Sequence, residues 1–136
     1  MKRWLIVLGL VASLTACLPP SLFQSEMPVT VSLSDSGGTA ALIPGQPLVV
    51  RLPTNPSTGY SWSYTVKGDD VLRLDSVSGV SASANGMVGS PGEQVWSFRA
   101  QGTGHSVLTY VYTRAWEKTM PPAQTVMLNV AVKTAP

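Results

Sequence analysis

The sequence predicts an all-β domain, an immunoglobulin-like β-sandwich of about seven to eight antiparallel strands. Short runs in which apolar and polar residues alternate recur through residues 28–136. Clusters of Gly, Pro, Ser, Asn and Asp separate these runs at intervals of roughly 8 to 12 residues, which is the turn spacing of a sandwich. After the first 16 residues, no segment keeps the 3.6-residue period of a helix. We therefore expect two packed sheets and no helical layer.

The expected strands differ in the strength of their pattern. The runs 60–66, 105–113 and 125–132 alternate regularly, and the first of them carries aromatic residues on one face and Ser or Thr on the other. The run 71–77 is weaker and leads into a low-complexity stretch, 76–92, which is rich in Ser, Ala and Gly. The expected strands, in order, are 29–33, 39–43, 48–52, 60–66, 71–77, 95–100, 105–113 and 125–132.

The core is expected to form by apolar burial alone. The chain has one cysteine, so the Cys–Trp–Cys framework of antibody-type domains is absent. Each large side chain buried in such a core contributes roughly 1.5–3 kcal/mol. The large side chains on the apolar faces of the expected strands are Trp62, Trp96, Phe98, Leu108 and Tyr112.

The first 16 residues predict a secretory signal peptide. Lys2 and Arg3 precede a short apolar run. A membrane span requires about 20 apolar residues, and this run is shorter. The alternative is an N-terminal membrane helix. The four residues 14–17, Leu-Thr-Ala-Cys, resemble the bacterial lipobox.

The resemblance to the lipobox implies cleavage before Cys17 and lipidation of its thiol and amine. Several acyl chains together anchor a protein stably. No aspartate follows Cys17, which by resemblance to bacterial sorting rules favours the outer membrane. The alternative is an unpaired thiol after a plain signal peptide. We expect an exported, lipid-anchored envelope protein divided into a signal peptide, a lipidated cysteine with its tether, and one domain, at residues 1–16, 17–27 and 28–136.

The charge of the chain does not point to a nucleic-acid partner. The sequence has 9 Lys and Arg against 7 Asp and Glu. Removing Lys2 and Arg3 with the signal peptide leaves 9 − 2 = 7 basic residues against the same 7 acidic residues. Because the mature chain is near neutral and has no basic run, we expect no nucleic-acid binding.

Catalytic and metal-binding patterns are also missing from the sequence. His105 is the one histidine, and no Gly-x-Ser-x-Gly turn occurs. One histidine and one cysteine do not make a zinc or copper site. The carboxylates are scattered among expected turns and look solvated: Asp35, Asp69, Asp70, Asp75, Glu93 and Glu117. We therefore expect neither an enzyme nor a bound metal or cofactor.

Three non-strand segments remain, 55–59, 86–92 and 114–122, and alternate loops of a sandwich collect at one end. In the first, Pro56 fixes its own φ and Gly59 can adopt positive φ, so the tip is expected to be stiff and suited to insertion into a narrow cleft. The alternative is an ordinary interstrand loop.

The third segment, 114–122, begins with Arg114, Ala115 and Trp116. Arg and Trp are enriched at binding hot spots. The alternative is that Trp116 folds back onto the sandwich and Arg114 is a solvated surface charge.

Taken together, the three segments resemble the motifs of the chagasin family, inhibitors of papain-like cysteine peptidases. The family's first motif is Asn-Pro-Thr-Thr-Gly-aromatic-x-Trp, and here it is Asn55-Pro56-Ser57-Thr58-Gly59-Tyr60-Ser61-Trp62. The family's Gly-rich segment before Trp-x-Phe corresponds to 86–92 followed by Trp96-Ser97-Phe98. Its last motif, Gly-x-Gly, Leu and Tyr-x-Arg-Pro-Trp, corresponds to Gly102-Thr103-Gly104, Leu108 and Tyr112-Thr113-Arg114-Ala115-Trp116.

The resemblance implies reversible, non-covalent blockade of a papain-like cysteine peptidase by a monomer. Thr58 would approach the catalytic thiol, Trp116 would pack on an aromatic surface of the enzyme, and Arg114 would support Trp116 by hydrogen bonding. The middle loop would lie along the unprimed side of the cleft. The peptidase-binding residues implied are Asn55, Pro56, Ser57, Thr58, Gly59, Gly89, Ser90, Pro91, Gly92, Arg114, Ala115 and Trp116.

Ala115 departs from the family pattern, which has Pro at this position. Since Pro would stiffen the loop, Ala115 is expected to raise the entropic cost of ordering Trp116. The competing hypothesis is a structural or adhesive envelope lipoprotein that binds a protein partner through the same loops.

Overall fold

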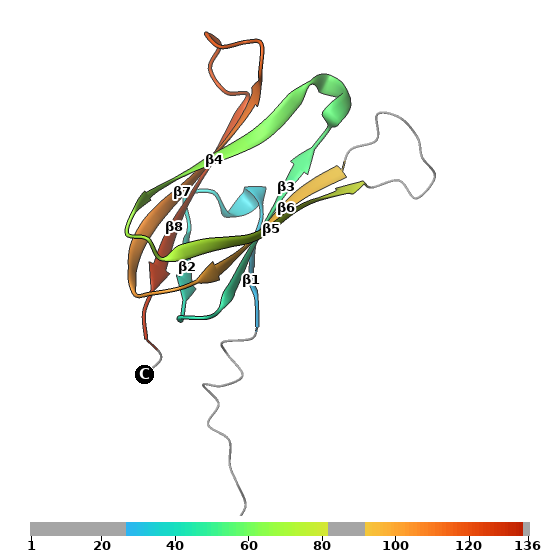
Figure 1. The fold of residues 1–136 in the computed structure, drawn as a ribbon. Helices are drawn as coiled ribbons and strands as arrows, with labels where there is room; N and C mark the ends of the chain where they lie inside the picture. The colour runs from blue at the N-terminus through green and yellow to red at the C-terminus, as the bar shows by residue number, and fades with distance from the viewer. Residues whose placement is uncertain (1–26, 82–91, 135–136) are drawn as a thin grey trace, which may run out of the picture.

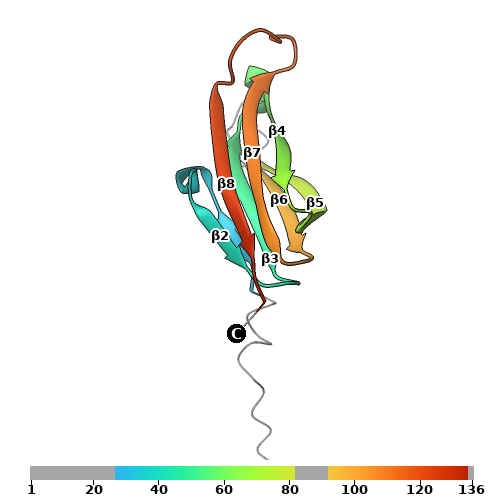
Figure 2. The same cartoon turned by 90° about the vertical axis from the view of Figure 1, so that its left-hand side faces the viewer.

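Two four-stranded sheets face each other in the computed structural model, which describes residues 27–81 and 92–134 (Figure 1, Figure 2). The order of the first sheet is β1-β3-β6-β5, and that of the second is β2-β8-β7-β4. The strands are β1 (Val29–Val31), β2 (Thr39–Leu42), β3 (Pro47–Thr54), β4 (Tyr60–Gly68), β5 (Leu72–Ser81), β6 (Gly92–Ala100), β7 (Gly104–Arg114) and β8 (Gln124–Val132). The predicted all-β sandwich is confirmed.

Not every strand pair is antiparallel, contrary to the prediction. β1 pairs with β3, and β2 pairs with β8, in parallel register. A short 3₁₀ helix, η1 (Leu33–Asp35), follows β1 and carries the chain from the edge of the first sheet to the edge of the second. The first strand was predicted to continue to residue 33, but Leu33 belongs to this helix, where Ser32 and the Asp35 carboxylate form a capping box. A short strand thus forms one edge of each sheet, β1 in the first and β2 in the second.

Several strands extend beyond their predicted ends because sheet pairing overrides local breakers. β3 continues through Pro53 to Thr54, and β5 continues into the Ser-rich stretch as far as Ser81. β6 begins three residues before the predicted start, at Gly92, where it pairs with both of these strands. A register shift between Leu74 and Ser76 bends β5, which fits the weak pattern of this run.

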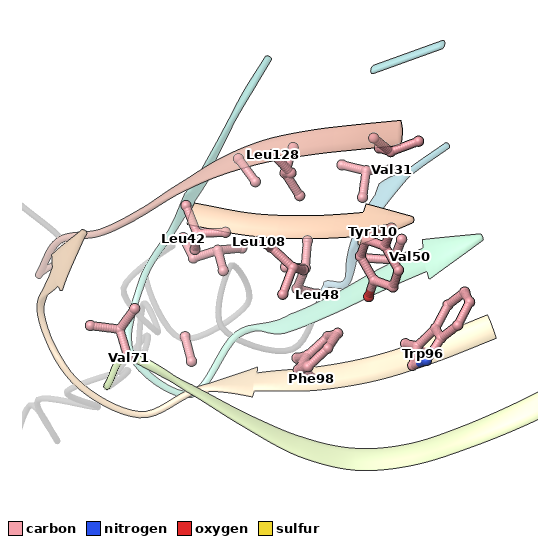
Figure 3. Close-up of a cluster of buried hydrophobic side chains, with 14 of the residues drawn as sticks. Val31, Leu42, Leu48, Val50, Val71, Trp96, Phe98, Leu108, Tyr110 and Leu128 are labelled. Carbon is pink, nitrogen blue, oxygen red and sulfur yellow. The ribbon is translucent and has the colours of Figure 1, made fainter. Parts of the chain in front are cut away.

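The hydrophobic core lies between the two sheets, and Figure 3 shows its side chains converging from both. Trp62, Trp96, Phe98 and Leu108 are buried, as predicted. The fifth predicted core residue, Tyr112, is only half-buried because it lies near the end of β7, where the sandwich opens.

Tyr110 is a large aromatic core residue that was not among the five predicted. It lies at mid-strand on the same face of β7 and is fully buried. Its ring contacts Trp96 at 4.7 Å and Tyr64 at 5.5 Å between centroids. Its hydroxyl has no hydrogen-bond partner among the described residues. Burial, and secondarily the proximity of Tyr64, raises the pKa of Tyr110 above its ordinary value.

The two ends of the sandwich differ. At one end, which we call the loop end, β3, β5 and β7 finish and β4, β6 and β8 begin. At the other end, the base, β1 and β3 begin and β4 and β8 finish. Gln46 at the base donates a hydrogen bond of 3.0 Å to the carbonyl of Met27, so the described chain enters the fold at the base.

Candidate functional site

The first and third candidate loops lie at the loop end, in the upper part of Figure 1, and the strands that flank the middle loop, β5 and β6, meet at the same end. The register pairs Tyr60 with Arg114, which places the end of the first loop next to the start of the third in the second sheet. It also pairs Thr54 with Gly92, which brings the end of the middle loop beside the start of the first. Gly92 is described and half-buried, whereas Gly89, Ser90 and Pro91 lie outside the described residues, as does Cys17.

The first loop, residues 55–59, forms a single closed turn that we call the wedge. Residues Pro56–Thr58 make the 3₁₀ turn η2, which begins after an extended Asn55 and ends at Gly59 with φ 78°. The Thr58 hydroxyl donates to the Asn55 carbonyl at 2.7 Å, and the Ser57 hydroxyl donates to the Asn55 side-chain oxygen at 2.6 Å. Pro56, Ser57 and Thr58 are all exposed. The local sequence therefore gives a rigid, uncharged and protruding tip.

Aromatic side chains of the sandwich hold the base of the wedge. The Trp62 indole N–H donates to the Pro53 carbonyl at 2.8 Å, just before the wedge begins. The Tyr112 hydroxyl accepts a hydrogen bond of 3.1 Å from the Asn55 backbone N–H. The Tyr112 ring stacks on Trp62 at 4.7 Å and on Tyr60 at 5.1 Å between centroids. Tyr112 thus contributes to loop position more than to the core.

Arg114 connects the third loop to the wedge. Its Nε donates to the Thr58 carbonyl at 3.1 Å, and its guanidinium lies 4.3 Å from the centroid of the Tyr60 ring. A second nitrogen donates to the Glu117 carboxylate at 3.2 Å. With hydrogen bonds to two partners and an aromatic face beneath it, Arg114 is not the solvated surface charge of the alternative interpretation.

Trp116 lies against the wedge while remaining 67% exposed. The ring occupies the space beside Gly59, where an added Cβ would lie 3.0 Å from Cζ2 and 3.1 Å from Cζ3 and would clash with Cη2. Its ring centre is 5.9 Å from the Arg114 guanidinium, so these two residues meet through a cation–π contact. Trp116 therefore neither enters the core nor stands free, and the neighbouring Ala115 is exposed.

The charges near the loop end are mostly paired. An ion pair of 2.8 Å joins Arg51 on β3 to Glu93, the second residue of β6. Arg114 and Glu117 form the other. His105 is the second residue of β7, at the base and away from the wedge. No group of three or more His, Cys, Asp or Glu side chains within residues 27–81 and 92–134 could hold a metal ion.

Two contacts of the site were not foreseen from the sequence, namely Asn55 with Tyr112 and Thr58 with Arg114. The partners are 57 and 56 residues apart along the chain. The sequence carried a weak signal for these contacts. The regular alternation of β7 puts Tyr112 on the same face of the strand as Arg114, two residues later. The hydrogen bonds depend on the β4–β7 register, which alternation alone does not specify.

In the part of the chain that the structure describes, no helix has the length and apolar character needed to cross a membrane.

Residues 42–130 match a family model described as "Chagasin family peptidase inhibitor". Amoebiasin-2 of Entamoeba histolytica is 27% identical over 84 residues, which make up 62% of this chain and 68% of that protein. The match to the family model covers all three loops and, apart from the last two residues of β8, the strands that carry them.

The fold is similar to those of several solved structures. The crystal structure of the cysteine protease inhibitor EhICP2 from Entamoeba histolytica gives a TM-score of 0.70 at 23% identity and covers 78% of this chain and 96% of that one. The solution structure of Amebosin gives 0.63 at 27% identity, covering 79% and 100%. PbICP-C, in complex with falcipain-2, gives 0.53 at 19% identity, covering 81% and 92%.

These comparisons confirm two expectations drawn from the sequence, the family resemblance and the absence of an enzymatic role, since the matched family consists of peptidase inhibitors. The chain belongs to the chagasin family of peptidase inhibitors.

Proposed function

We propose that the chain is a reversible, non-covalent inhibitor of papain-like cysteine peptidases, and that the wedge enters the catalytic cleft between the two flanking loops. The observation that carries this proposal is the closed turn at residues 55–59, which is exposed, internally hydrogen-bonded and tied to the third loop through Arg114. Related chains support the choice of target, since EhICP2 is described as a cysteine protease inhibitor and PbICP-C was solved in complex with falcipain-2.

The shape of the wedge explains how it could block a peptidase without being cleaved. A substrate is bound as an extended strand, whereas Pro56–Thr58 form a 3₁₀ turn. The Thr58 carbonyl oxygen already accepts a hydrogen bond from Arg114. It is therefore poorly placed to accept the hydrogen bonds that the oxyanion hole of a peptidase donates to a substrate carbonyl. In this proposal Thr58 lies nearest the catalytic thiol, and steric exclusion alone blocks the cleft.

The pre-formed wedge also favours tight binding. Most of its ordering entropy is lost on folding, because Asn55, Ser57, Thr58 and Arg114 already satisfy one another. Trp116, with two thirds of its surface exposed, supplies the large apolar contact beside the wedge. Gly92 and the middle loop before it would complete the contact on the other side.

We further propose that the mature chain is exported and anchored to the envelope through a lipid on Cys17. Mass spectrometry of the membrane fraction tests this point, because an unmodified Cys17 would exclude lipidation. The inhibitory proposal does not depend on the outcome.

A competition assay with papain tests the proposed function. The chain lacking residues 1–21 should inhibit papain competitively and reversibly. Thr58→Glu should abolish inhibition and lower the thermal unfolding midpoint by a few degrees at most, because Thr58 is exposed at the tip and loses one exposed hydrogen bond, to the Asn55 carbonyl. Thr65→Glu is the matched control, since Thr65 is also exposed but lies on β4 away from the wedge. No inhibition by the unmodified chain at micromolar concentration would refute the proposal and favour the adhesive alternative.

A further inference from the structure

A shallow trough lies on the outer face of the second sheet, towards the base. Its volume is about 620 Å³, and it crosses β4, β7 and β8. Val107 and Ala131 contribute half-buried small apolar side chains to its lining. Its lining also includes the polar and basic side chains of Lys67, His105, Asn129 and Lys133.

The two lysines of the trough are available for an external partner. The ion pairs formed among the described residues involve Arg51, Arg73, Arg99 and Arg114, and none includes Lys67 or Lys133. Both lysines are exposed and come from different strands, one at the end of β4 and the other just after β8. The trough therefore presents two positive charges around a lining that is partly apolar.

Two acidic residues of the base, Asp69 and Asp70, lie near the trough without lining it. The Asp69 carboxylate accepts a hydrogen bond of 2.9 Å from the His105 backbone N–H, and the Asp70 carboxylate accepts one of 3.2 Å from the Gln101 side chain. Neither carboxylate lines the trough. The lining of the trough therefore contains two lysines and no carboxylate, with Asp69 bonded to the backbone of its residue His105.

The position of the trough indicates its partner. Met27 contacts Gln46 at the base, and the wedge is at the opposite end. Twenty-six residues precede Met27, and the stretch from Cys17 to Met27 can reach at most about 35 Å when extended. A chain anchored through Cys17 would thus keep the base within about 35 Å of the lipid headgroups, with the wedge at the far end of the domain.

We propose that this trough is a membrane-contact surface, in which Lys67 and Lys133 bind the phosphate groups of anionic phospholipids. The inference rests on the proposed anchoring through Cys17. It gives the anchored inhibitor an orientation, with the loop end facing peptidases that arrive from the aqueous compartment. Tethering makes so small a contact effective, because it raises the local lipid concentration far above that in solution.

Lysine footprinting on vesicles tests the proposal. The chain from Cys17 onward is coupled through its one thiol to a maleimide lipid, in vesicles of phosphatidylcholine with or without phosphatidylglycerol. Acetylation of each lysine is then followed by peptide mass spectrometry. Lys67 and Lys133 should react about fivefold more slowly on the anionic vesicles, as expected for lysines held at an anionic surface. Lys118, an exposed lysine of the third loop, is the internal control and should react equally on both.

Salt and free phosphate distinguish a membrane contact from a site for a free anion. The protection of Lys67 and Lys133 should disappear at about 1 M salt, where the screening length falls to roughly 3 Å. Equal labelling of Lys67 and Lys133 on both vesicles would overturn the proposal, as would equal protection of Lys118. Protection by inorganic phosphate on phosphatidylcholine vesicles would also overturn it, because the trough would then bind phosphate without a membrane.

Papain inhibition measured on the same vesicles separates this inference from the proposed function. If labelling is unchanged but papain is inhibited, the membrane contact is wrong and the inhibitor proposal survives. If Lys67 and Lys133 are protected but papain is not inhibited, the membrane contact stands and the inhibitor proposal is wrong.

Discussion

Replacing Gly59 with Ala should separate the folding role of this glycine from its role in the site. Gly59 has φ 78°, a conformation that costs an L-residue about 1–2 kcal/mol. An added Cβ would also lie 3.0 Å and 3.1 Å from two atoms of the Trp116 ring and would clash with a third. Because Trp116 is exposed, the ring can move aside, and the second effect should appear in binding more than in stability.

Gly37→Ala provides the matched control for Gly59→Ala. Gly37 has φ 86°, so the backbone cost is similar, but a Cβ there would meet no atom within 4 Å. Its backbone N–H donates to the carbonyl of Met127 on β8. Gly37 lies just before β2, which forms the edge of the second sheet opposite β4. Both variants should lower the unfolding midpoint by a similar amount, about 4 °C for each kcal/mol lost in a domain of this size.

Inhibition of papain should distinguish the two variants. Gly37→Ala should inhibit as the unmodified chain does, whereas Gly59→Ala should raise the inhibition constant at least about tenfold, which corresponds to roughly 1.4 kcal/mol. Calorimetry gives the midpoint and a progress-curve assay gives the constant. If both variants inhibit equally well, the contact between Trp116 and Gly59 does not matter for binding, and the reasoning is refuted.

Three further substitutions test other contacts. Tyr110→Phe should leave the free energy of unfolding unchanged or raise it by up to about 1 kcal/mol, because the buried hydroxyl has no partner among the described residues; a clear loss of stability in urea unfolding at neutral pH would show that the hydroxyl is satisfied. Burial raises the pKa of Tyr110, so the unfolded chain releases this proton above about pH 10 while the folded chain retains it; stability should fall through that range, and less steeply in Tyr110→Phe. Arg114→Lys retains the charge but loses the planar contact with Tyr60 and the directed bond to Thr58, so the inhibition constant should rise roughly tenfold with little change in the unfolding midpoint; an unchanged constant would mean that Arg114 does not position the wedge. Trp116→Ala should weaken inhibition at least about tenfold while the midpoint stays within a few degrees, and a large drop in the midpoint would instead identify Trp116 as part of the fold.

Much of the fold could be predicted because alternation reports which face of a strand is buried. Trp62, Trp96, Phe98 and Leu108 follow the period of two and lie in the core. The parallel pairing of β1 with β3 and of β2 with β8 could not be predicted, because β1 and β2 are only three and four residues long. The burial of Tyr110 and the partial exposure of Tyr112 depend on distance from the loop end, which a repeating pattern does not encode.

The candidate site was predictable to a similar degree. The local chemistry of the wedge follows from residues 55–59 themselves, since Pro56 and Gly59 have the backbone preferences that the turn requires. The bonds from Arg114 to Thr58 and from Asn55 to Tyr112 depend on how β4 and β7 pair. The substitution of Ala115 for the family's Pro was expected to loosen the third loop, yet Trp116 is supported by its contact with Gly59 and by Arg114. The wedge thus supplies part of the support that Pro would give.

Disulfide trapping with papain tests the central claim most directly, namely that Thr58 lies over the catalytic thiol. In a chain whose own cysteine is replaced by Cys17→Ser, Thr58→Cys should form a mixed disulfide with the catalytic cysteine under mild oxidation, at least about tenfold faster than Thr65→Cys. The product is a one-to-one covalent complex by mass, and prior alkylation of the enzyme's thiol should prevent it. Equal rates for the two cysteine variants, or no complex with Thr58→Cys, would contradict the account.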